Sequence, residues 1–210
     1  QKLRGTHRFF VYFANENNKL EIDFKDINLE SGFDDIEVRI YKENELIGKE
    51  TLKDDNNKEN NVKFSDALFV ADNKKINLDN YLKESSLYKI EIVSNNDIVI
   101  NKIKSSSDKI VFINNIWPVS DLIIQDYYTN SKILNAKTYQ AESFSTLNFN
   151  NQDLVLDKSY KNFYIENKDG DLKKIRVNKS DIMLSVNGYI SLNKETFFSP
   201  EINSLDRFFN

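Results

Sequence analysis

Residues 36–52 read IEVRIYKENELIGKETL, and this stretch indicates most clearly which kind of fold the chain adopts. Apolar β-branched residues alternate with polar ones over 36–41, which is the pattern of a strand that buries one of its faces. The polar cluster at 42–44 interrupts the alternation, and Leu46 and Ile47 resume the apolar character beyond it. The stretch therefore predicts a β-hairpin.

Similar units recur along the whole chain. Short apolar or alternating runs are separated by clusters of turn-forming residues, a pattern typical of β-sandwiches and jelly rolls. No helix of three turns or more is predicted. Strands are predicted at 8–13, 20–27, 62–70, 76–82 (a strand or a short helical turn), 109–117, 121–128, 132–139, 144–149, 153–156, 160–166, 171–177 and 181–192, with a second hairpin at 88–103. The predicted class is all-β.

A chain of 210 residues has room for two domains. The run KSSSDK at 104–109 is small and polar, as linkers are, so we expect a boundary there. The prediction is two consecutive antiparallel β-sandwich domains, jelly-roll or Ig-like, at 1–104 and 105–210. A long loop within one sandwich would have the same composition and is the alternative.

Composition narrows the range of partners. The chain has 29 basic and 33 acidic residues, well mixed, and a net charge of −4, so no basic stripe for nucleic acid is expected. It has no cysteine, which excludes disulfides and thiolate metal sites. No apolar run reaches the roughly 18 residues of a membrane-spanning helix, so no transmembrane segment is expected. With only 5 glycines and 2 prolines, the 29 asparagines are expected to form many of the turns.

The first half resembles a known family. The segment GFDDIEVRIY at 32–41, the polar turn with Leu46 and Ile47 after it, and LYKIEI at 87–92 are similar to bacterial pre-peptidase C-terminal β-sandwich modules. The resemblance covers about residues 6–104. Ser86 stands where that family usually has a glycine before the tyrosine. The resemblance implies an exported, non-catalytic accessory or surface module, and the second half also looks similar to uncharacterised bacterial surface modules.

Catalytic motifs do not stand out in the sequence. Histidine is the usual general base and metal ligand, and the only one is His7. No glycine pattern of a nucleophile elbow accompanies any serine. Paired carboxylates of the kind that cleave glycosidic bonds arise by chance among 33 acidic residues, and nothing marks a cleft. We therefore expect no enzymatic activity, and a surface or strand-end position for His7.

Calcium is the only cofactor that the sequence suggests. Asn167, Asp169 and Asp171 alternate as oxygen ligands do in a calcium loop, but the glycine between the two aspartates stands one position too early for an EF-hand. Asp-Gly is also a strong hairpin signal, so an ordinary turn is the alternative reading. The acidic pairs at 34–35 and 54–55 are further candidates for calcium, with solvated loops as their alternative.

Aromatic residues suggest a second kind of site. Flat rings bind sugars by stacking, and Trp117, Tyr127 and Tyr128 are the candidate ligand-binding residues. Core packing is the alternative for Trp117, because it follows an apolar strand. Further candidates for the same platform are Tyr139, Tyr160 and Tyr164. The terminal aromatics either dock onto the second domain or contact a neighbouring subunit, and they are Phe197, Phe198, Phe208 and Phe209.

Together these observations lead to an expectation about function. We expect a non-enzymatic extracellular or cell-surface β-sandwich protein with a structural, adhesion or assembly role. Its expected partner is another protein or a second copy of the chain at the cell surface, with a glycan as a further candidate. The alternatives are a carbohydrate-binding module and a calcium-dependent accessory domain of a secreted enzyme.

Overall fold

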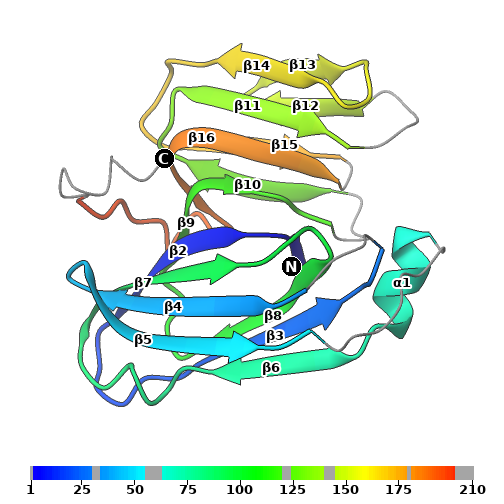
Figure 1. Cartoon of the computed structure of the whole chain (residues 1–210). Coiled ribbons are helices and arrows are strands. Elements are labelled where there is room, and N and C mark those ends of the chain that lie inside the picture. Colours follow the sequence, from blue (N-terminus) through cyan, green and yellow to red (C-terminus); the bar gives the residue numbers. More distant parts are fainter. Residues whose placement is uncertain are drawn as a thin grey trace.

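Two antiparallel sheets contain more than half of the described residues (Figure 1). The computed structural model describes residues 2–29, 34–54, 63–119, 124–139, 145–178 and 181–201. The small sheet has the order β1 (Leu3–Arg4), β8 (Ile98–Ser105), β3 (Leu20–Asp26) and β6 (Asn73–Asn77). The predicted all-β class is confirmed.

The large sheet runs through both halves of the chain. Its order is β13 (Gln152–Leu156), β12 (Ser145–Phe149), β15 (Lys173–Val177), β10 (Gln125–Thr129), β16 (Ile182–Ser191), β9 (Ile110–Ile116), β2 (His7–Phe13), β7 (Ser86–Val93), β4 (Ile36–Lys42) and β5 (Glu45–Leu52). Two further strands branch from it, because β16 also pairs with β11 (Ile133–Thr138), and β11 with β14 (Asn162–Glu166).

The core follows from the alternating pattern of the strands. In the first half, the apolar faces of β2, β4 and β7 pack against those of β3 and β8, and Val38, Ile90 and Ile22 are all completely buried. In the second half, Leu134 and Leu184 belong to the same contiguous cluster. Burial of large apolar side chains at about 25 cal/mol per Å² is the main stabilising contribution.

The strand β9 joins the two halves. It pairs with β2 on one side and with β16 on the other, so the sheet is continuous beyond the predicted boundary. In Figure 1 the strands β10 to β16 form the upper part of the molecule and curl until β13 lies beside β14. The division at residues 104 and 105 stays a prediction.

The hairpin at 36–52 is confirmed as β4 and β5. Its two turn residues, Glu43 and Asn44, both have positive φ, 50° and 69°, as a type I′ turn requires. Asparagine takes most such positions in this glycine-poor chain, as predicted. Of the nine described non-glycine residues with positive φ, six are asparagines, namely Asn17, Asn28, Asn44, Asn114, Asn150 and Asn151.

The second predicted hairpin is wrong. The strands β7 and β8 do form at the predicted places, but β7 pairs with β2 and β4, whereas β8 pairs with β1 and β3. The turn at 94–97 is therefore a corner between the two sheets. It is held by its contacts with other segments, since the Thr6 hydroxyl donates to the Ser94 carbonyl at 2.8 Å and Ile27 N–H to the Asp97 carbonyl at 3.0 Å.

The strand predicted at 62–70 is also wrong, because most of it is a short helix. Helix α1 (Phe64–Val70) has Asp66 in its first turn, where the helix dipole favours a negative charge. Ala67 and Leu68 pack into a small cluster with Trp117. A short segment that is mostly apolar is compatible with either structure until its packing is known. Among the described residues, no helix has the length and apolar composition needed to cross a membrane.

The ring of Tyr81 packs directly over a glycine of β5. A Cβ atom placed on Gly48 in β5 would lie 2.4 Å from Cδ1 of Tyr81, so the ring rests directly on the backbone. The Tyr81 hydroxyl donates to Glu50 Oε1 at 2.6 Å, which fixes the ring in that position. Gly48 is therefore required by close packing, with no demand on its φ angle.

Gly48→Ala is expected to destabilise the protein by roughly 1–3 kcal/mol, because the added methyl group forces Tyr81 out of its place. Urea unfolding measures the change. In a Tyr81→Ala background the same substitution should cost much less, because the clash is gone. Equal costs in the two backgrounds would contradict this packing.

Candidate functional sites

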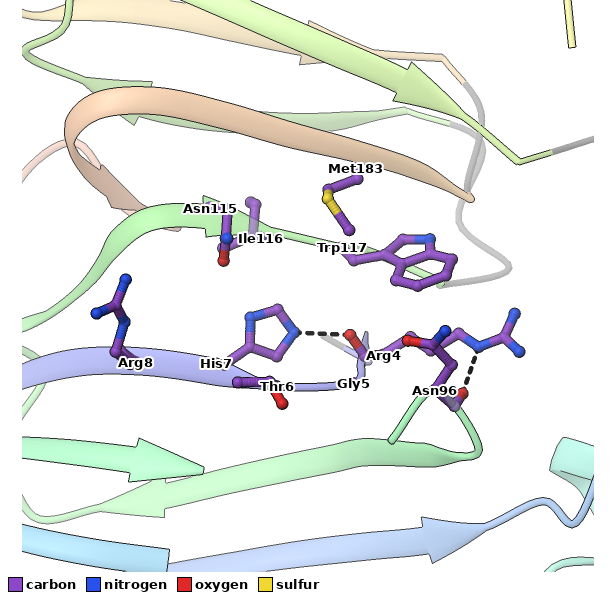
Figure 2. Close-up of a pocket in the computed structure, with 10 residues that line it drawn as sticks. All are labelled: Arg4, Gly5, Thr6, His7, Arg8, Asn96, Asn115, Ile116, Trp117 and Met183. Atoms are coloured by element: carbon purple, nitrogen blue, oxygen red, sulfur yellow. Dashed lines mark hydrogen bonds between the residues drawn. The ribbon is translucent and has the colours of Figure 1, made fainter. Parts of the chain in front are cut away.

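A cavity of about 310 Å³ lies where β2 and β9 separate (Figure 2). The ladder between these strands ends at Phe9 and Phe112. Beyond it Asn114 has a positive φ of 64°, and Asn115 and Ile116 pair with β16 instead of β2; the two segments meet again where Arg4 N–H donates to the Trp117 carbonyl at 2.9 Å. Ten residues line the gap, mostly from these two segments. The cavity thus arises from the sharing of β9 between the two halves.

His7 stands in the middle of this cavity. Its ring is 1% exposed and packs edge-on against Phe112, with centroids 6.0 Å apart. Nε2 lies 3.0 Å from the backbone carbonyl of Arg4, and because a carbonyl only accepts, Nε2 carries the proton. Nδ1 makes no hydrogen bond of acceptable geometry. Burial lowers the His7 pKa to about 4, against smaller opposing contributions from the carbonyls of Arg4 and Asn115. The ring is therefore neutral at neutral pH.

Two arginines give the cavity a positive charge. The Arg4 guanidinium lies between the rings of Phe64 and Trp117, 5.0 and 4.9 Å from their centroids, and its Nε donates to the Asn96 carbonyl at 2.5 Å. These contacts hold it in one orientation. Arg8 lines the opposite end (Figure 2). No carboxylate is among the lining residues.

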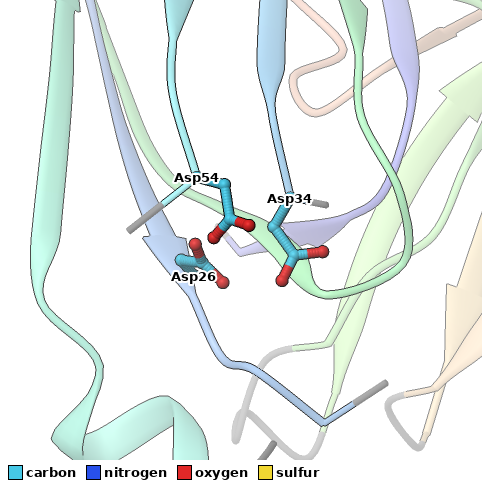
Figure 3. Close-up of side chains that lie close together, drawn as sticks. All are labelled: Asp26, Asp34 and Asp54. Atoms are coloured by element: carbon cyan, nitrogen blue, oxygen red, sulfur yellow. The ribbon is translucent and has the colours of Figure 1, made fainter. Parts of the chain in front are cut away.

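Three aspartates meet at one end of the first sandwich (Figure 3). Asp26 ends β3, Asp34 precedes β4 and Asp54 follows β5, and one carboxylate oxygen of each lies within 4.8 Å of the others. Asp26 and Asp34 are buried, and Asp26 Oδ2 accepts from Lys74 Nζ at 2.9 Å. Carboxylate oxygens at such distances are the ligands that Ca²⁺ and Mg²⁺ prefer.

The cluster is electrostatically costly. Burial is the main cause that raises the Asp34 pKa, and the neighbouring charges of Asp97 and Asp54 raise it further. Hydrogen bonds from Asn95 and with Asp26 act in the opposite direction. As the pH falls, Asp34 therefore takes up a proton more readily than an exposed aspartate does, and a bound cation would offset the same repulsion.

In the predicted calcium loop at 167–171, the side chain of Asn167 forms hydrogen bonds to the backbone of the loop and of a neighbouring turn. The Asn167 carboxamide is buried, and its Oδ1 accepts from Asp169 N–H at 2.9 Å while its Nδ2 donates to the Asn150 carbonyl at 3.2 Å. Asp169 and Asp171 are exposed. The Lys173 ammonium donates to the Gly170 carbonyl at 2.6 Å, so a cation already lies against this loop. Calcium binding at this loop stays a prediction, whereas the pairs at 34–35 and 54–55 do contribute Asp34 and Asp54 to one cluster.

The predicted aromatic platform is not assembled. Tyr127 is completely buried, Tyr128 is half-buried, and Trp117 is 4% exposed. Tyr139 stacks on one face of Trp117 at 4.1 Å and Arg4 covers the ring as well, so Trp117 offers no free face to a sugar. Tyr160 and Tyr164 are exposed. Of the terminal aromatics, Phe197 and Phe198 pack against Phe10, Val111, Ile113 and Tyr189, and Phe208 and Phe209 lie outside the described residues.

Sequence reasoning missed several residues of these sites. Asp26 follows Leu20, Ile22 and Phe24 on the buried side of an alternating strand, but it belongs to no motif in the sequence. Arg4 and Arg8 precede or begin a strand and carry no motif. Charge could have revealed them. The chain is acidic overall and has few arginines, yet two of them stand four residues apart, on either side of the only histidine.

Comparisons with protein families, with curated proteins and with solved structures found no match to this chain. The resemblance of residues 6–104 to pre-peptidase C-terminal modules therefore stays a prediction.

His7 should make the stability of the protein depend on pH. The folded state lowers its pKa from 6.5 to about 4, so the contribution is fully present above pH 6.5 and is lost as the pH falls towards 4. The loss should reach roughly 3 kcal/mol. Urea unfolding followed by Trp117 fluorescence measures it, and His7→Leu should lack this part of the slope. Identical pH dependence in the two proteins would refute the assignment.

Proposed function

We propose that this protein is a non-enzymatic module of the cell surface or extracellular space, with a structural, adhesion or assembly role. The observation that carries the proposal is the continuous large sheet, in which β9 belongs to the ladders of both halves. A shared strand fixes the relative orientation of the two parts. A protein whose two parts keep a fixed orientation holds its binding surfaces at fixed distances from one another, and a scaffold or an adhesive module needs this.

The ionisable groups support a non-catalytic role. General acids and bases work best with a pKa near the operating pH. The His7 pKa is about 4, and hydrogen bonds from Arg176 hold the pKa of Asp126 at about 2. Glu21 is paired with Lys104, which likewise lowers the Glu21 pKa. These groups lie far from the range in which they would exchange protons at neutral pH.

Helix α1 offers a surface on which a partner could bind. Phe69 is 86% exposed and Val70 67%, although the helix is otherwise anchored by Ala67 and Leu68. Two adjacent apolar side chains in water are a cost that a protein partner or a second copy of the chain would remove. The partner proposed here is therefore a protein.

A calcium-dependent accessory domain of a secreted enzyme is the second candidate. The observation that favours it is the meeting of Asp26, Asp34 and Asp54. Two of these carboxylates are buried, and their mutual repulsion would be relieved by a divalent cation. The role of calcium in this alternative is to stabilise the loops at one end of the sandwich.

Surface location is tested on intact cells of the source organism with an antibody against the purified chain. We expect labelling without permeabilisation, and its loss after protease treatment of the intact cells. A cytosolic protein labelled in parallel reports leakage. Labelling that appears only after permeabilisation would overturn the proposal.

The calcium alternative predicts a melting temperature that is higher in calcium than in chelator. A calcium concentration of 100 times Kd adds about 2.7 kcal/mol, which corresponds to a rise of about 5 °C or more for a chain of this size. Asp34→Asn should abolish the rise and Asp171→Asn should leave it intact, because Asp171 lies outside the cluster. Circular dichroism measures both, and a flat response in the unmodified protein removes this alternative.

A further inference from the structure

A second apolar cluster lies on the outer face of the large sheet. Along β2, Phe9 and Val11 belong to the main core, whereas Phe10 between them points to the opposite side. This cluster, here called the outer face, crosses the neighbouring strands β7, β2, β9 and β16, and its members are Leu87, Phe10, Val111, Ile113 and Tyr189. The outward side of an antiparallel sheet normally carries polar residues, so an apolar cluster there needs a cover.

The cover is the segment that follows β16. Residues 192–201, here called the arm, leave the end of β16 and are drawn in red in Figure 1. Phe197 and Phe198 of the arm pack against the outer face. The arm belongs to neither sheet as a strand. Ring packing, and not a backbone ladder, therefore docks the arm onto the outer face.

Two hydrogen bonds fix the end of the arm. The Tyr189 hydroxyl donates to the Pro200 carbonyl at 2.8 Å, and Asn130 Nδ2 donates to Ser199 Oγ at 3.1 Å. The chain thus turns back on itself after β16, since Pro200 returns to a residue near the end of that strand. Every group that receives the arm precedes the arm in the sequence, so the seat is complete without it.

The hinge between β16 and the arm lies in water. Leu192 is 41% exposed, and residues 193–195 are exposed as well. Local hydrogen bonds shape the turn, since Asn193 N–H donates to Ser191 Oγ at 3.1 Å and Glu195 N–H to Asn193 Oδ1 at 2.9 Å. Such a turn can open without disturbing either apolar cluster.

The arm leaves part of the outer side of the sheet uncovered. Tyr12 points to the same side of β2 as Phe10, lies opposite Leu87 of β7 and is 36% exposed. Phe197 and Phe198 are themselves only half-buried. Arm and outer face together therefore still present apolar surface to a further molecule.

We propose that two copies of the chain associate through their outer faces by exchanging arms. The arm of each copy places Phe197 and Phe198 on the outer face of the other copy, and the remaining apolar surface, with Tyr12, is buried between them. The occupant is a second copy because the outer face already fits the arm of this same chain. Exchange of an identical element reproduces the contacts of the single copy, so it is a low-cost route to a dimer.

This inference deepens the assembly role and rests on the proposed function for its biological meaning. The two can fail separately. Arm exchange is measured on the purified chain alone, whereas surface location is measured on cells. Exchange in a protein that is not on the surface would refute only the proposed function, and a surface protein without exchange would refute only this inference.

Cross-linking between two marked copies tests the exchange. The chain has no cysteine, so each introduced thiol is unique. One copy carries Asn130→Cys and the other Ser199→Cys, at positions whose side chains lie 3.1 Å apart when the arm is seated. The two purified proteins are mixed, incubated and treated with a short bis-maleimide. We expect a heterodimer joined between residues 130 and 199, identified by mass spectrometry of its peptides.

Ser65→Cys is the matched control for Ser199→Cys. Both serines are exposed, but Ser65 lies on α1, outside the arm. Its mixture with Asn130→Cys measures cross-linking by random collision, and we expect about tenfold more heterodimer with Ser199→Cys, because the seated arm raises the effective concentration of its thiol. A synthetic peptide of residues 192–201 should suppress the heterodimer. The same peptide with alanine in place of both phenylalanines should not.

A shortened hinge gives an independent test. Residues 193–195 carry the turn by which the arm reaches its own copy, so their deletion leaves the outer face open to the arm of another copy only. We expect the shortened protein to be a dimer by light scattering. Adding Phe197→Ala and Phe198→Ala should return it to a monomer, because the exchanged rings hold the two copies together. Thermal melting of each variant confirms that it folds.

Three results would overturn the inference. They are equal heterodimer yields with Ser199→Cys and Ser65→Cys, a yield that the peptide of residues 192–201 leaves unchanged, and a hinge-shortened protein that folds and remains a monomer.

Discussion

The pairing of β9 with both β2 and β16 is the constraint on which the rest of the structure depends. Phe112 faces Phe9 across the ladder, with ring centroids 5.5 Å apart, and the next residues of β9 leave β2. Asn114, with its positive φ, makes the change of direction without a glycine. Because one short strand serves two ladders, the halves share a core, and the cavity at His7 opens where the strands part.

Sequence patterns predicted where strands lie better than which strands they join. The apolar residues of 88–92 and 98–103 correctly indicated two strands, and the burial of β7 alternates along the strand, because the period of two is local. It carries no information on the partner strand. The sequence of the turn between them is compatible with a hairpin and with a corner between two sheets. Hydrogen bonds with Thr6 and Ile27, some 70 to 90 residues away in the sequence, make it a corner.

The candidate sites were predictable only in part, for the same reason. Asp34 and Asp54 could be suspected because each stands in an acidic loop, and local composition shows that. Asp26 could not, since only the tertiary fold brings the end of β3 beside them. Likewise, sequence alone cannot tell that Arg4 and Tyr139 cover Trp117.

Both candidate sites lie where ladders end or separate. This follows from how a β-sheet pairs its backbone groups and distributes its side chains over two faces. Inside a ladder the backbone is paired and side chains are either core or solvent-facing, so polar groups have little reason to converge. Asp34 stands just before β4, and His7 begins β2. At such points buried polar groups are kept despite a cost that shows in their shifted pKa values. A fold built mainly of strands therefore places its clusters of polar groups at the breaks between ladders.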